Sequence, residues 1–137
     1  EIGVGLVGSE MCIRDSHDSG ATRPLLLATL FAMEQDFYLG YLRERHGIDA
    51  VVPKERDRME VHRVIYEELC QGKVLDSSKR AYMQIIDRAC SDADAPADSV
   101  IFGCTEIGLL ITPDDFSFPA FDTTVLHAEA ALTFAGY

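Results

Sequence analysis

The sequence predicts an α/β fold, in which a parallel sheet of three to four strands carries helices on both faces. Short apolar runs alternate with longer amphipathic segments, and this alternation is typical of strands joined by helical crossovers. The chain has 137 residues and 47% hydrophobic residues, which is enough for one domain with a buried core. The expected strands are residues 25–28, 48–52 and 99–102, with residues 118–121 as a candidate fourth strand.

Helical segments are expected between and after these runs. They cover residues 33–46, residues 56–70, a segment capped by Asp76 or Ser77 that continues through 82–89, and a final segment from Asp122 to Ala135. Gly47 and Gly72 follow two of these segments, at the position where a helix often ends in a left-handed residue.

Residues 1–19 do not fit this organisation. They show neither the period of a helix or strand nor the composition of a linker. We interpret them as a leader outside the fold, a product of a sequence junction, and assign the α/β domain to residues 20–137.

The composition argues against a nucleic-acid-binding, membrane-spanning or secreted protein. The formal net charge of −11 disfavours nucleic acid as a partner. No apolar run approaches the roughly 20 residues of a membrane span, and the first residues lack the basic start of a secretory signal. A cytoplasmic protein without membrane contact is therefore expected.

The cysteines and histidines do not predict a metal site. The sequence has four of each, and no two cysteines stand at a CxxC interval. Scattered thiols of this kind are usually buried and inert, and this interpretation suits Cys70 and Cys90. Neither a metal nor a cofactor is expected.

Cys104 is placed differently, because it directly follows the expected strand 99–102 and precedes a short helix. Ligands of open α/β sheets bind at the carboxyl ends of the strands. A helix N-terminus there lowers the pKa of a thiol and offers backbone N–H groups to an anion. Gly103 permits a close turn, and Thr105 adds a hydroxyl. Cys104 is thus predicted to act as a thiolate base or nucleophile, with a small structural core cysteine as the alternative.

The neighbouring polar residues have simple structural interpretations when each is taken alone. Glu106 suits the first turn of a helix, and Thr29 suits a helix cap. Asp122 is a natural N-cap, and His127 suits a surface or interface position.

Together, these segments resemble the aspartate/glutamate racemase superfamily. Residues 100–107 (VIFGCTEI) look like the second cysteine motif of that family. Three further segments agree in order and approximate spacing, namely 25–35 (LLLATLFAMEQ), 64–72 (VIYEELCQG) and 121–131 (FDTTVLHAEAA). The resemblance extends from about residue 20 to the end of the chain.

This resemblance implies a two-lobed racemase that works without a cofactor, with one cysteine from each lobe. One thiolate removes the α-proton of an amino acid, and the opposing thiol returns a proton to the other face. By position, Cys104 is the second of these thiols. The resemblance gives substrate-binding roles to Thr105, to the following backbone at Glu106, and to Thr29. It also places Lys73 near the binder of the side-chain carboxylate.

The chain departs from the family pattern in several places, among them a longer acidic turn before the strand at residues 99–102. Residues 28–33 (ATLFAM) lack one glycine and one hydroxyl of the usual turn, and Cys12 is followed by residues unlike those around the first catalytic cysteine. Cys12 therefore receives no catalytic role. The resemblance therefore implies that the first lobe is missing, and the chain is expected to be inactive alone. The expected partners are that lobe, a small amino-acid substrate and a second copy in a homodimer.

Three alternatives remain open at this level. The chain could be a non-catalytic α/β module that binds carboxylates, or a lobe of a related isomerase or decarboxylase of small diacids. An unrelated flavodoxin-like domain would require the matched segments to be coincidental.

Overall fold

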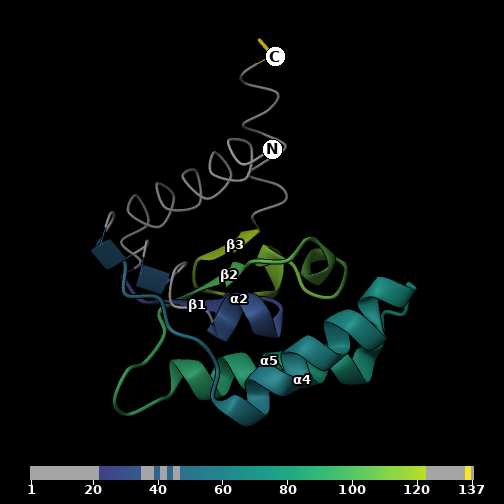
Figure 1. The fold of residues 1–137 in the computed structure, drawn as a ribbon, viewed down its shortest axis with the longest axis horizontal. Coiled ribbons are helices and arrows are strands. Elements are labelled where there is room, and N and C mark those ends of the chain that lie inside the picture. Colours follow the sequence, from purple (N-terminus) through teal and green to yellow (C-terminus); the bar gives the residue numbers. More distant parts are fainter. Residues whose placement is uncertain (1–21, 35–38, 41–42, 45–46, 123–134, 137) are drawn as a thin grey trace.

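A parallel three-stranded sheet forms the centre of the structure, a computed structural model that describes residues 22–34, 39–40, 43–44, 47–122 and 135–136. Its strands are β1 (Pro24–Leu27), β2 (Ser99–Phe102) and β3 (Ala120–Asp122), in the order β1-β2-β3 (Figure 1). All four residues of β1 and of β2 are buried. Burial on both faces explains why these strands are continuous apolar runs in the sequence.

The pairing brings the carboxyl ends of the three strands to one edge. Leu27 pairs with Phe102, and Phe102 pairs with Asp122. β3 begins at Ala120 instead of the predicted residue 118, because Pro119 has no N–H to donate to the neighbouring strand. The Pro119 carbonyl still accepts the N–H of Val100 at 3.1 Å.

The run at residues 48–52 also lies parallel to β1, although it forms only an isolated bridge between Leu25 and Val51. The Leu26 N–H donates to the Val51 carbonyl at 2.8 Å, and the Val51 N–H donates to the Pro24 carbonyl at 2.9 Å. The predicted parallel arrangement of the three apolar runs is therefore confirmed. Pro53 ends the run before a regular strand can extend, since proline cannot donate to the ladder.

Helices pack against this sheet and bury the rest of the core. They are α2 (Leu30–Glu34), α4 (Glu55–Glu67), α5 (Asp76–Cys90) and the short 3₁₀ helices η1 (Leu69–Gln71), η2 (Thr105–Leu109) and η3 (Pro113–Asp115). Figure 1 shows α4 and α5 side by side below the strands. Val61, Val64 and Ile65 form the buried side of α4, and Tyr82, Ile85 and Ile86 that of α5.

Two glycines end helical segments as predicted. Gly47 has a φ of 66°, and its N–H donates to the Arg43 carbonyl at 3.1 Å. Gly72 follows η1 with a φ of 78°, and its N–H donates to the Leu69 carbonyl at 3.1 Å. This conformation costs glycine little because it has no Cβ.

The end of α4 and the start of α5 differ from the prediction. The helix expected to reach Cys70 ends at Glu67, and its last turn tightens into η1. The predicted cap at Asp76 or Ser77 is wrong. Leu75 is the N-cap residue, because its carbonyl accepts the N–H groups of both Ser78 and Lys79 at 3.1 Å. Asp76 instead lies in the first turn, where a carboxylate interacts favourably with the helix dipole.

Of the helix expected at residues 33–46, the structure describes α2 (Leu30–Glu34), which begins three residues before the expected start, and helical residues at 39–40 and 43–44. The expected closing helix, with His127, falls mostly on residues 123–134, outside the described residues. The same holds for residues 1–19 with Cys12. Within the described ranges, no helix is long and apolar enough to span a membrane.

Candidate active site

The segments that follow β1 and β2 leave the sheet next to each other. The Gly103 N–H donates to the Leu27 carbonyl at 2.8 Å, which continues the pairing one residue past β2. Thr29 stands two residues beyond the end of β1, and Cys104 stands two residues beyond the end of β2. The parallel register therefore brings Thr29 and Cys104 to the same carboxyl edge, where ligands of open α/β sheets bind.

The close approach of these two segments requires a glycine at position 103. A Cβ there would lie 2.9 Å from Leu26 Cδ1, 3.2 Å from Ala28 Cβ and 3.3 Å from the Leu27 carbonyl oxygen. The predicted tight turn at Gly103 thus has a steric cause, since two side chains and one carbonyl of residues 26–28 occupy the space of a side chain.

Cys104 is the N-cap residue of η2 and is half-buried. Its thiol donates a hydrogen bond to Glu106 Oε2 at 2.8 Å. The hydroxyl of Thr105 donates to the same carboxylate oxygen, also at 2.8 Å. The structure therefore joins three of the predicted site residues through one carboxylate.

This arrangement raises the pKa of the Cys104 thiol to about 11. Burial is the largest cause, followed by the hydrogen bond to the Glu106 carboxylate, which accepts the thiol proton and carries a like charge to the thiolate. In turn, the hydrogen bonds from Cys104 and Thr105 lower the pKa of the Glu106 carboxyl. The prediction of a lowered thiol pKa is wrong in this structure. The short η2 helix does not outweigh burial and a neighbouring carboxylate.

Thr29 caps α2, as its sequence position predicts. The Met33 N–H donates to the Thr29 carbonyl at 3.0 Å, the first bond of the helix. The next residue, Leu30, donates its N–H to Nδ1 of His62 on α4 at 2.9 Å. The sequence does not reveal His62, because nothing in the local pattern of α4 signals a contact 32 residues away.

Lys73 lies in the exposed loop between η1 and α5. Its N–H donates to the Glu68 carbonyl at 2.8 Å, which fixes the start of the loop. The preceding helix η1 contacts η2, the helix that begins after Cys104. The contact with the Cys104 segment is thus made by η1, which ends two residues before Lys73.

A buried acidic residue that the sequence did not reveal supports this loop. Glu68 is 7% exposed and accepts hydrogen bonds from the Ser78 hydroxyl and, at 2.9 Å, from Arg63 Nη1. These bonds join the end of α4 to the start of α5 and so hold η1 in place.

Asp122 is the last residue of β3, and the helix that it was predicted to cap lies outside the described residues. A Cβ at Gly108 would come within 2.6 Å of Asp122 Oδ2, so the carboxylate rests directly against η2. The third strand therefore also ends beside the Cys104 segment.

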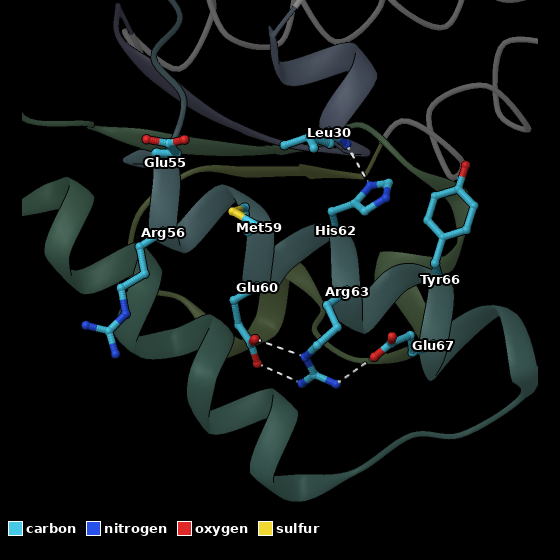
Figure 2. A pocket seen from close by; sticks show the side chains of 9 residues that line it. All are labelled: Leu30, Glu55, Arg56, Met59, Glu60, His62, Arg63, Tyr66 and Glu67. Atoms are coloured by element: carbon cyan, nitrogen blue, oxygen red, sulfur yellow. Dashed lines mark hydrogen bonds and ion pairs between the residues drawn. The ribbon is translucent and has the colours of Figure 1, made fainter.

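An open pocket of ≈ 790 Å³ lies along α4 and the start of α2. Figure 2 shows its apolar part, where His62 points toward the Leu30 backbone and Tyr66 stands beside the imidazole. The two rings are 4.5 Å apart. Glu60 and Arg63 pair at 2.8 Å on the charged side of the pocket. Within the described part of the chain, no group of three or more His, Cys, Asp or Glu side chains is arranged to hold a metal ion.

The comparison with known proteins agrees with the motif at Cys104. A model of the Asp/Glu/Hydantoin racemase family matches residues 6–131. The chain belongs to this family. The predicted resemblance is therefore confirmed, and so is the parallel α/β fold.

Solved structures of racemase-type proteins share this fold. A candidate Asp/Glu racemase from Yersinia pestis is 41% identical, with a TM-score of 0.83, and the match covers 93% of this chain and 54% of that one. An aspartate racemase homologue from Pyrococcus horikoshii is 30% identical, with a TM-score of 0.79 and the same coverage. The Picrophilus torridus aspartate racemase, at 23% identity and a TM-score of 0.61, shows the fold alone, with 95% and 50% covered. This chain spans about half the length of these structures.

Proposed function

We propose that this racemase-family chain supplies one acid/base thiol, Cys104, to a cofactor-independent racemase that acts on aspartate or glutamate. The observation that carries the proposal is the hydrogen bond from Cys104 to Glu106 at the carboxyl edge of the sheet. Membership in the racemase family supports the reaction class, and the names of the similar structures support the substrate class. The second acid/base group is expected from the other lobe of the fold.

The raised thiol pKa assigns Cys104 the role of proton donor at the start of one reaction direction. A base on the opposite face removes the α-proton of the bound amino acid, and the electron pair is delocalised into the α-carboxylate. The Cys104 S–H bond then breaks, its proton forms the new Cα–H bond, and a thiolate remains beside Glu106. In the opposite direction this thiolate is a strong base, because burial and the carboxylate both favour its protonated form.

The α-carboxylate of the substrate is expected to bind Thr105, the backbone N–H at Glu106, and Thr29. In the described state the Thr105 hydroxyl donates to Glu106. Its predicted role therefore requires the hydroxyl to rotate from Glu106 to the substrate. Lys73 is the proposed partner of the side-chain carboxylate. It lies in an exposed loop after η1, and its flexible side chain can carry the ammonium group toward the ligand.

Isotope exchange tests the reaction class. Each enantiomer of aspartate and glutamate is incubated with the chain in deuterated water, and deuterium uptake at Cα is followed together with optical rotation. Because Cys104 is one positioned group and racemisation needs two, we expect slow exchange on one enantiomer with little interconversion. Efficient racemisation by this chain would instead reveal a second acid/base group, with Cys12 as the first candidate.

A carboxylate-binding module without catalysis is the second candidate function. The observation that favours it is the protonated resting state of Cys104, which makes the thiol a poor base at neutral pH. Binding of aspartate without any deuterium uptake would support this candidate. Exchange on a small diacid but not on an amino acid would support a related isomerase or decarboxylase. The cytoplasmic location and the homodimer stay predictions from the sequence.

A further inference from the structure

The N-terminus of α2 is held by a side chain from another helix. Thr29 caps α2, so Leu30 carries one of the first N–H groups that have no partner within the helix. Such groups are usually satisfied by a capping side chain, by water or by a ligand. Here the acceptor is His62 Nδ1 at 2.9 Å (Figure 2).

The position of His62 is itself fixed by α4. Its neighbour Val61 is 0% exposed, as is Val64 one turn further along, so this part of the helix is anchored in the core. The imidazole also packs against the ring of Tyr66, with centroids 4.5 Å apart. Since Nδ1 accepts a hydrogen bond, the neutral ring carries its proton on Nε2.

This bond acts on the residue that stands opposite Cys104 at the sheet edge. Thr29 directly precedes Leu30, and the register of β1 and β2 places Thr29 beside the Cys104 segment. A shift of the Leu30 backbone therefore moves Thr29 relative to Cys104 and Thr105. α2 also packs against α4, and the bond between His62 and Leu30 adds a directed polar link to that contact.

We propose that His62 is a positioning residue for the carboxylate subsite around Thr29. It acts through the Leu30 N–H and does not touch the substrate. This role rests on the proposed function for the subsite, but it concerns a residue that the racemase motif does not contain. Loss of the Nδ1 acceptor should loosen the start of α2 and weaken binding of an α-carboxylate, while Cys104 and Glu106 remain hydrogen-bonded to each other.

Two conservative variants test whether the hydrogen-bond acceptor must stand at the position of Nδ1. In His62→Asn the side-chain oxygen lies near the position of Nδ1, whereas in His62→Gln it lies near that of Nε2. Asparagine should therefore keep the bond to Leu30, and glutamine should lose it. Met59→Ala is the matched control, because Met59 lines the same pocket on the same helix and is 58% exposed.

The experiment uses the 137-residue chain, with L-aspartate as the probe. Amide hydrogen exchange at Leu30 and the Kd for L-aspartate are both followed by NMR. We expect His62→Gln to speed Leu30 exchange and to raise the Kd by about fivefold each, the usual effect of one lost hydrogen bond. The asparagine and Met59→Ala variants should stay within about twofold of the wild type. Circular dichroism checks that each variant is folded.

The outcomes distinguish this inference from the proposed function. If the glutamine and asparagine variants behave alike in exchange and in binding, His62 does not act through its Nδ1 acceptor, and the inference is overturned. If the wild-type chain does not bind L-aspartate, the proposed function is contradicted and the role of His62 in that subsite falls with it. Faster Leu30 exchange in His62→Gln without weaker binding would also overturn the role in the subsite.

Discussion

Replacing Glu106 by glutamine tests how the Cys104 thiol is kept protonated. The Glu106 carboxylate accepts the thiol proton at 2.8 Å and the Thr105 hydroxyl proton at 2.8 Å. Glutamine keeps an oxygen acceptor but removes the negative charge. Because the carboxylate is the second cause of the raised thiol pKa, after burial, the variant should lower the pKa without restoring its ordinary value.

The size of the expected change in thiolate fraction follows from the pKa shift of Cys104. A rise from 9.0 to about 11 lowers the thiolate fraction at neutral pH about a hundredfold, since each unit is a factor of ten. Burial is the largest single cause, and Glu106 raises the thiol pKa both through its hydrogen bond and through its charge, so Glu106→Gln should lower this pKa. Each unit by which the pKa falls should increase the thiolate fraction at pH 8 about tenfold.

The assay is the rate of alkylation of Cys104 by iodoacetamide as a function of pH, read by mass spectrometry of the peptide that contains it. Peptide mapping separates Cys104 from Cys70 and Cys90, which are also free thiols. Cys90 serves as an internal control, because burial raises its pKa and Glu106 is not among the causes. An unchanged or higher pKa for Cys104 in the glutamine variant would refute this account of the thiol.

Two further variants test the fold around the site. Gly103→Ala should destabilise the chain by about 1–3 kcal/mol, because its Cβ would lie 2.9 Å from Leu26 Cδ1, and a urea midpoint equal to the wild type would contradict this. The carboxylate of Asp98 accepts the N–H groups of Thr22 at 2.8 Å and Arg23 at 3.0 Å. Burial raises its pKa, but these hydrogen bonds outweigh burial and lower it, so the stabilisation is present above pH 3.8 and is lost as the pH falls through the lowered pKa. In urea titrations at a series of pH values, Asp98→Asn should lose less stability on acidification than the wild type does. An equally steep loss of stability in the variant would count against this role of Asp98.

The strands and the place of Cys104 were predictable because they depend on local sequence. A fully buried parallel strand needs a continuous apolar run, and residues 25–27 and 100–102 are such runs. Gly47 and Gly72 were predictable as helix ends because few other residues adopt a positive φ at low cost.

The features that the sequence did not reveal depend on contacts between distant segments. The contact of His62 joins α4 to a backbone N–H on α2, and no helical period encodes that partner. The raised pKa of Cys104 depends on burial, which only the assembled core determines. The cap at Leu75 was missed because the backbone alone sets it, whereas the prediction relied on the side chains of Asp76 and Ser77.

The most direct test of the central claim is deuterium uptake at Cα of aspartate in the presence of the wild-type chain, Cys104→Ala and Cys70→Ala. Cys70 is the matched control, because it is an exposed free thiol on η1, the helix that contacts η2. The account predicts slow uptake on one enantiomer with the wild type and with Cys70→Ala. It also predicts at least about a hundredfold slower uptake with Cys104→Ala, the usual contribution of a positioned acid/base group. Uptake that survives the loss of Cys104, or none with the wild-type chain under conditions in which aspartate binds, would contradict it.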